Sequence, residues 1–155
     1  MQKIGAKPVL LLAALASFIF VSAGNTKLTE KWQIKTSNGS KIPAGWQPFG
    51  YDSNDQSDPF LLRRSTNGNW DATQKWEVKT SNGSKIPVGW QPFGYDSNDQ
   101  SDPFLLRRST NGNWNATQKW EVKTSNGSKI PVGWQPFGYD SNDQSDPFLI
   151  RHRIG

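Results

Sequence analysis

Hydrophobic and polar side chains alternate along several short stretches of this chain. Residues 75–80 read KWEVKT, a two-residue period of apolar and polar positions. This period is typical of a β-strand with one buried face and one face in water. Residues 104–108, FLLRR, follow Pro103 and contain a continuous apolar run, so they predict the best-buried strand of their neighbourhood. No stretch beyond residue 23 has a helical period, and an all-β fold is therefore expected.

Turn signals separate these stretches. Residues 81–84, SNGS, and 109–113, STNGN, each contain an Asn-Gly pair, and both residues of such a pair tolerate positive φ. Residues 87–92, PVGWQP, are bounded by prolines, which cannot donate to a sheet ladder, so a short strand or a bulge is expected rather than a regular central strand. Residues 96–102, DSNDQSD, are all polar and predict a surface loop that buries nothing.

The whole pattern recurs at an offset of 44 residues, which brings Trp32, Trp76 and Trp120 into register. Residues 72–105 reappear unchanged as residues 116–149, and the copies span about 28–71, 72–115 and 116–155. Three to four strands per copy predict roughly 9 to 12 strands in all.

A single copy of this length cannot bury its own hydrophobic face. We therefore expect a single repeat domain over residues 24–155, in which the copies share a core about a pseudo-threefold axis, as in a β-trefoil or a β-prism. Three independently folded copies are the alternative.

The first 23 residues have the features of an export signal. Lys3 and Lys7 provide a positive start, residues 9–21 an apolar region, and residues 21–23, VSA, small side chains suited to cleavage. The apolar region is shorter than the roughly 20 residues that a membrane-spanning helix needs. We expect no stable membrane insertion and a secreted, periplasmic or extracellular protein.

The composition of the chain narrows the range of binding partners and chemistries to be expected. Loss of the signal would remove two of the 18 Lys and Arg residues and leave 16 against 13 Asp and Glu, a net charge of +3. This mild excess is spread over the copies, whereas nucleic-acid binders concentrate basic residues in a patch or arm, so no nucleic-acid partner is expected. The chain has no Cys, which removes thiol nucleophiles, disulfides and Cys-ligated zinc. The pattern does not define an oligomeric state.

Catalytic residue types are scarce. His152 is the one histidine of the chain, it lies near the C-terminus, and the other copies have Arg in its place. A Ser-His-Asp or His-metal site would depend on this single residue. We therefore expect no enzyme, and His152 is expected to be a surface residue.

The eight Trp residues favour a binding function. Indole faces stack on sugar C–H groups, while Asn, Asp and Gln side chains bond hydroxyl groups. Trp70 and Trp114 lie beside Asn-Gly turns and are expected to be the better exposed indoles. For Trp32, Trp46 and their equivalents, a place in the core and a place on the surface fit the pattern equally well. The predicted ligand-binding residues are Asp52, Asp96, Asp140, Asn54, Asn98, Asn142, Trp70 and Trp114.

The same polar loops are rich in oxygen ligands of the kind that calcium prefers. They lack the Gly and the terminal Glu of an EF-hand loop, so a solvated loop is the alternative. No other cofactor is implied. The carboxylates that would hold calcium are Asp52, Asp55, Asp58, Asp96, Asp99, Asp102, Asp140, Asp143 and Asp146.

Each copy carries a fixed order of short motifs, which in the second copy are Trp76 and residues 81–83 (SNG), 86–89 (IPVG), 94–96 (GYD) and 103–107 (PFLLR). This order resembles the DM-nine repeat lectins, in which a Trp is followed by an Asn-Gly turn, a Val/Ile-Pro-x-Gly step, a Gly-x-Asp loop and an apolar strand ending in Arg. The resemblance covers about 30 residues of each copy.

The resemblance implies an all-β protein that binds mannose-type sugars, with the loop Asp, here Asp52, Asp96 and Asp140, making polar contacts. The family's second contact, a Lys in a later Gly-Lys step, is missing because the copies are shorter than the family repeat. The Gly-Trp-x-Pro core also resembles small bacterial domains with a Gly-Trp-Glu-Leu step, but those carry a helix before the Gly-Trp and none fits here.

Together these observations predict a secreted, multivalent, lectin-like protein for glycans or glycoconjugates, with three equivalent weak sites whose avidity compensates for weak individual binding. The alternative is a non-enzymatic envelope or extracellular repeat protein with a structural or interaction role, stabilised by calcium.

Overall fold

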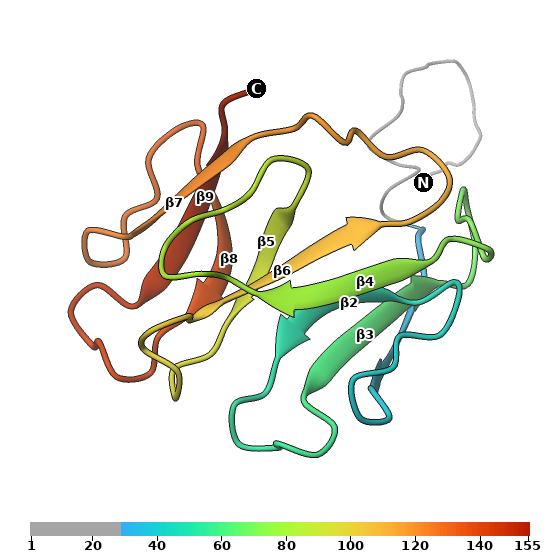
Figure 1. Ribbon diagram of the computed structural model, residues 1–155, viewed down its shortest axis with the longest axis horizontal. Coiled ribbons are helices and arrows are strands. Elements are labelled where there is room, and N and C mark those ends of the chain that lie inside the picture. The colour runs from blue at the N-terminus through green and yellow to red at the C-terminus, as the bar shows by residue number, and fades with distance from the viewer. Residues whose placement is uncertain (1–28) are drawn as a thin grey trace, which may run out of the picture. The chain divides into compact units, whose positions relative to one another are not determined.

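Residues 29–155 are described in the computed structural model, and they form strands but no helix. The all-β expectation is confirmed. Figure 1 follows the three copies along the colour bar, from blue through green and yellow to red. The strands are β1 (Trp32–Thr36), β2 (Gln47–Tyr51), β3 (Phe60–Ser65), β4 (Trp76–Thr80), β5 (Gln91–Tyr95), β6 (Phe104–Ser109), β7 (Trp120–Thr124), β8 (Gln135–Tyr139) and β9 (Phe148–Arg153).

Each copy contributes one sheet of three strands, and the last strand of the copy lies in the middle. The orders are β1-β3-β2, β4-β6-β5 and β7-β9-β8. In the second copy β6 is antiparallel to both neighbours, with Trp76 opposite Ser109 and Gln91 opposite Arg107. The central strand is also the best buried of its copy, as its apolar run predicted, because both of its edges are paired and both of its faces are covered. Leu105 lies in a cluster with copy 1, and Phe104 and Leu106 lie in a cluster with copy 3.

The proline-bounded segment forms an edge strand only at its end. Residues 87–90 lie outside any strand, and β5 then carries Pro92 at the free edge of the sheet, where no donor is needed. The register with β6 shifts between Pro92 and Gly94, which is a β-bulge. The expectation of a short strand or bulge at residues 88–90 is therefore wrong in place: residues 88–89 form a turn, the short strand begins at Gln91, and the bulge follows Pro92.

The chain divides into two compact units, which are described separately. Of the described residues, the first contains 29–32 and 65–69. Within it, Lys31 N donates to Asn67 Oδ1 at 2.6 Å, and Thr66 N donates to Lys31 O at 2.9 Å. The second unit contains residues 33–64 and 70–155, and so holds most of all three sheets.

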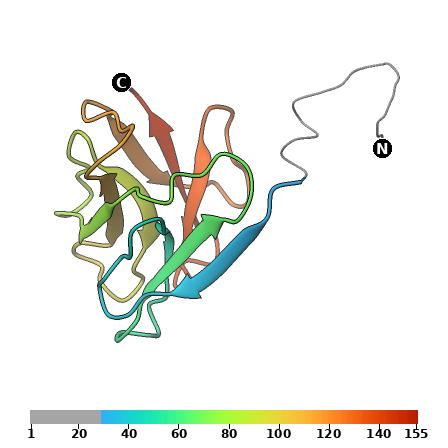
Figure 2. The ribbon, with the colours of Figure 1, turned by 90° about the vertical axis from the view of Figure 1, so that its right-hand side faces the viewer.

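The three sheets have a pseudo-threefold arrangement, as expected from the repeats, and Figure 2 gives a second view of their strands. Strand β5 of the middle copy contacts both β2 and β8. Consecutive copies therefore pack directly on each other rather than folding as isolated units.

The hydrophobic core of the second unit consists of two clusters, and each cluster joins two consecutive copies. One contains Trp46, Phe60 and Leu62 of copy 1 with Phe93 and Leu105 of copy 2. The other contains Trp90, Phe104 and Leu106 of copy 2 with Leu149 of copy 3. Copies 1 and 2 therefore each depend on the next copy to complete their part of the core.

The predicted export signal, residues 1–23, lies outside the described residues. Among residues 29–155 there is no helix long and apolar enough to cross a membrane.

Candidate functional site

The polar loops that join the second and third strands of each copy are shaped by their own carboxylates. In the second copy, Asp96 N donates to Pro103 O at 2.7 Å and closes the base of the loop. Asp99 Oδ1 accepts hydrogen bonds from Asp102 N at 3.1 Å and Ser101 Oγ at 2.8 Å. Asp102 Oδ1 in turn accepts from Gly83 N at 2.7 Å, which ties the loop to the Asn-Gly turn.

These hydrogen bonds favour the ionised form of the middle carboxyl group. They lower the pKa of Asp55, chiefly through the backbone N–H of Asp58, and that of Asp99, chiefly through the Ser101 hydroxyl. Within residues 29–155 no three Asp, Glu or His side chains come together as ligands for a metal ion. The predicted calcium carboxylates instead accept hydrogen bonds from backbone N–H and hydroxyl groups.

The start of the second loop is not the fully solvated segment that its polarity predicted. Asp96 is only 9% exposed and Ser97 is also buried, because the loop of copy 1 lies against them. The Tyr51 phenol hydrogen-bonds the Asp96 carboxylate, and Asn98 Nδ2 donates to Ser53 O at 2.9 Å. Burial, followed by the Asp96 charge, raises the pKa of Tyr51. Asp96 and Asn98 are therefore contacts between copies.

The third loop repeats this junction with the second. Asp140, again 9% exposed, accepts a hydrogen bond from the Tyr95 phenol, and the pKa of Tyr95 is raised by burial and then by the Asp140 charge. Asn142 Nδ2 donates to Ser97 O at 3.1 Å. The Asp and Asn predicted to bind ligand in copies 2 and 3 are thus occupied by a hydroxyl and a carbonyl of the preceding copy.

Among the described residues no copy lies before copy 1, and its loop has different surroundings. Asp52 is half-buried and accepts from Asn54 N of its own loop at 2.9 Å, and Asn54 is exposed. In the part of the chain that the structure describes, neither side chain has a hydrogen bond to another copy. At the other end of the series, Tyr139 is 51% exposed. The three predicted sites are therefore chemically identical in sequence but not equivalent in space.

A glycine makes the close approach at each junction possible. A Cβ added at Gly138 would lie 3.1 Å from Cβ of Tyr95, a separation that real side chains seldom tolerate. At the equivalent position of copy 1, a Cβ added at Gly50 would meet only the side chain of Leu61 within its own copy. Glycine within a strand is a sequence signal of such backbone proximity.

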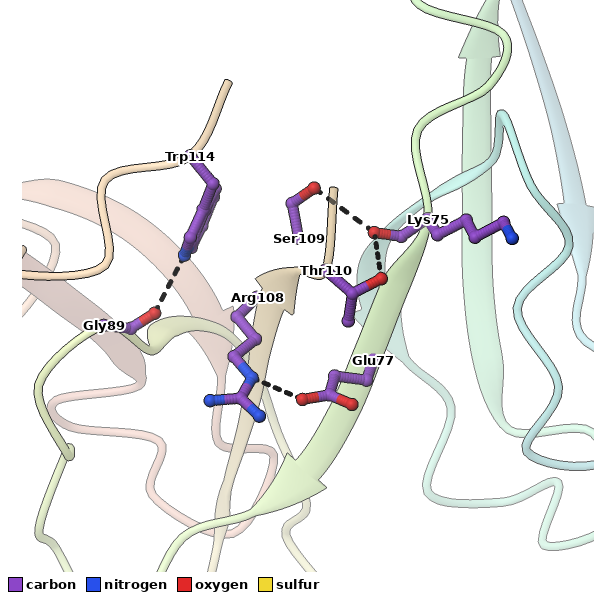
Figure 3. Close-up of polar contacts among 7 residues, drawn as sticks. All are labelled: Lys75, Glu77, Gly89, Arg108, Ser109, Thr110 and Trp114. Carbon is purple, nitrogen blue, oxygen red and sulfur yellow. Dashed lines mark hydrogen bonds and ion pairs between the residues drawn. The ribbon is translucent and has the colours of Figure 1, made fainter. Parts of the chain in front are cut away.

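The indoles predicted to be exposed have a structural task instead. Trp114 is half-buried, and its Nε1 donates to Gly89 O at 3.0 Å, as Figure 3 shows. Trp70 makes the same contact with Gly45 O at 2.9 Å. Each indole fastens the segment leading to the next copy onto a turn of its own copy. Trp70 and Trp114 are better exposed than the buried Trp46, Trp76 and Trp90, but Trp32, at 43%, is more exposed than either. Trp114 also packs edge-on against Trp76 at 5.3 Å.

A second set of indoles lies beneath cations. Trp90 is buried under Lys79 Nζ at 4.3 Å and the Arg108 guanidinium at 4.6 Å from the ring centroid. Arg108 also pairs with Glu77 across the sheet (Figure 3). In copy 3, His152 replaces this Arg and stacks on Trp134 with the ring centroids 5.1 Å apart. His152 is thus half-buried and packs on an indole. The faces of Trp90 and Trp134 are covered by these side chains and are not free to stack on a ligand.

The pattern of alternation did not point to a pocket that the three copies form together. The pocket has a volume of about 180 Å³ and lies where the sheets meet, on strands rather than loops. Its signal in the sequence is the recurrence of one Phe and one Arg per copy at the 44-residue spacing. The lining residues are Phe49, Phe93, Phe137, Arg63, Arg107, Arg151, Gln135 and Pro136.

No protein-family model, curated protein or solved structure matches this chain.

Proposed function

We propose that this is an exported, non-enzymatic carbohydrate-binding protein in which one loop, residues 52–58 of copy 1, receives the sugar. The observation that carries the proposal is the contrast between Asp52 with Asn54 and their counterparts in the other copies. The counterparts bind protein groups, whereas Asp52 and Asn54 have no partner from another copy in the described structure.

The two formed junctions indicate which chemistry this pair of side chains recognises. In each junction, the carboxylate accepts a hydrogen bond from a hydroxyl group, and the side-chain amide donates a hydrogen bond to a nearby carbonyl oxygen. A sugar offers both groups, since each hydroxyl donates and accepts. A neutral sugar with neighbouring hydroxyls could therefore bond Asp52 and Asn54 as Tyr95 and Ser97 bond Asp140 and Asn142.

This proposal replaces three equivalent sites with one. A single open site without a stacked indole gains only a few hydrogen bonds against water, so its affinity for a monosaccharide is expected to be weak, in the millimolar range. Avidity would then require several protein molecules on one surface rather than several sites on one molecule.

The test measures sugar binding to the full mature chain by NMR titration with methyl α-mannoside, alongside an array of neutral glycans. Asp52→Asn keeps the shape of the side chain but removes the charge that accepts hydroxyl protons. We expect this variant to lose sugar binding at least about 10-fold. The matched control is Asp71→Asn in the same copy, which removes the same charge outside the 52–58 loop, where the carboxylate accepts hydrogen bonds from its neighbour Thr73.

Two results would count against the proposal. Folded protein that binds no glycan on the array would favour a structural or interaction role for the repeats. A stoichiometry of three sugars per chain, with Asp96→Asn as damaging as Asp52→Asn, would restore three equivalent sites.

A further inference from the structure

The pocket between the sheets brings three guanidinium groups together. Arg63, Arg107 and Arg151 lie at equivalent positions of the central strands β3, β6 and β9, and all three line the pocket. Neither Asp nor Glu lines it. A cluster of like charges at the junction of three sheets is unfavourable for folding unless something compensates for it.

Each arginine is held in place by a neutral partner on the neighbouring strand. Nε of Arg107 donates to Gln91 Oε1 at 2.8 Å, and Nε of Arg151 donates to Gln135 Oε1 at 2.7 Å. One terminal nitrogen of Arg107 also donates to Pro48 O, and that of Arg151 to Pro92 O. These contacts fix the planes of the guanidinium groups but supply no negative charge.

The electrostatic consequence appears in the arginines themselves. Arg107 is only 6% exposed, and burial, followed by the charges of Arg151 and Arg63, lowers its pKa well below the ordinary value. Burial and then Arg63 lower the pKa of Arg151 to about 10. Guanidinium groups stay protonated in proteins at neutral pH, so the pocket holds positive charge without an Asp or Glu in its lining.

We propose that this pocket binds a small organic oxyanion: a carboxylate, phosphate or sulfate group carried on a single ring. The anionic group would lie against the guanidinium groups, which are suited to planar, two-pronged recognition of such oxygens. The ring would lie against Phe49, Phe93 and Phe137, one from each copy.

The size of the pocket limits the proposed ligand to a single ring. Its volume of about 180 Å³ is comparable to that of a cavity of about 150 Å³ known to accept benzene. Arg63 and Arg151 are half-buried while Arg107 is buried, so the pocket is open on the side of copies 1 and 3. This site lies on strands, away from the 52–58 loop, and it does not depend on sugar binding there.

The test is calorimetric and NMR titration of the mature chain with benzoate, at fixed pH and fixed ionic strength. Benzamide, which has the same shape without the charge, and inorganic phosphate, which has the charge without a ring, are titrated in parallel. Glucuronate, an acidic sugar, is titrated in the same way. We expect benzoate to bind, to raise the melting temperature, and to bind at least about 10-fold more tightly than benzamide.

Arg63→Gln removes one guanidinium from the open side of the pocket and should weaken benzoate binding about 10-fold or more. The matched control is Arg64→Gln, which removes the same charge one residue along the strand, where the guanidinium covers Trp46 at 4.5 Å outside the pocket. The control should keep the affinity for benzoate, and the melting temperature of each variant without ligand reports whether it folds.

Three results would overturn the inference: no binding of any anion by the folded wild-type chain, equal binding of benzamide and benzoate, or equal losses in Arg63→Gln and Arg64→Gln. Phosphate binding more tightly than benzoate would remove the ring from the proposal. Because Asp52→Asn lies outside this pocket, its failure to affect mannoside leaves benzoate binding independently measurable.

Discussion

Two loops of this protein have the same seven residues and different roles. Residues 52–58 and 96–102 both read DSNDQSD, yet the first two residues of the second loop are buried against copy 1 while those of the first loop are half-buried. The difference comes entirely from what precedes each loop in space. In tandem repeats, a side chain is a junction contact or a candidate ligand-binding group according to its neighbour, not its own sequence.

The same contrast extends into the core. Leu105 is 2% exposed and belongs to the cluster built around Trp46 and Phe60 of the preceding copy. Leu61 occupies the equivalent position in copy 1, has no preceding copy beside it in the described residues, and is only half-buried. The difference in burial between Leu105 and Leu61 can be measured as a difference in the free energy of unfolding.

Leu105→Ala should have the largest effect, because it removes a buried side chain from a cluster that joins two copies. We expect a loss of about 2–5 kcal/mol in the free energy of unfolding, against about 1 kcal/mol for Leu61→Ala. Urea denaturation of a chain of residues 24–155 measures both. Equal losses in the two variants would mean that copy 1 buries this position as fully as copy 2 does.

Tyr95→Phe should have an intermediate effect. The change leaves the Asp140 carboxylate, which is 9% exposed, without its phenol donor. Since Tyr95 itself is half-exposed, we expect a loss of about 1–2 kcal/mol. Tyr139→Phe is the matched control, since no hydrogen bond of its phenol is present in the described structure, and it should change stability by less than about 0.5 kcal/mol. A Tyr139→Phe loss as large as that of Tyr95→Phe would show that copy 3 also has a junction partner.

The smallest effect is a pH dependence at alkaline pH. The pKa values of Tyr51 and Tyr95 are raised in the folded chain, chiefly by burial and then by the neighbouring Asp carboxylate. The unfolded chain therefore releases these protons first, and the contribution to stability, complete below pH of about 10, is lost as the pH rises through the folded values.

Tyrosinate absorbance measured against pH should show a late component from these two residues. In Tyr51→Phe and in Tyr95→Phe that component should shrink. A late component that survives both junction substitutions would contradict the assignment of the raised pKa values to the junctions.

Much of the fold follows from local patterns. The alternation of residues 75–80 and the apolar run of 104–108 predicted β4 and β6, and the Asn-Gly pair at residues 82–83 forms the expected turn with Gly83 at φ +64. The 44-residue repeat predicted a similar set of strands in each copy and the pseudo-threefold arrangement. The strands and turns depend on contacts within a copy, which each copy encodes in full, and the threefold arrangement follows from the repetition itself.

The candidate sites depended on contacts between copies, which local patterns do not encode. Polarity predicted that residues 96–102 bury nothing, but Asp96 is buried because a phenol and a carbonyl from copy 1 satisfy its loop. Trp114 was expected to be exposed beside its turn, but the turn at Gly89 accepts its indole N–H.

The sequence by itself determined the strand content, the number of repeats, the absence of disulfides and the residue types at every loop, since these follow from composition and from short-range periodicity. Only the tertiary structure decided which of three identical Asp and Asn pairs stays uncovered, and that Arg63, Arg107 and Arg151 converge with three phenylalanines. The physical reason is that a repeat specifies the same chemistry three times, whereas the end of the series and the meeting point of the sheets each occur once.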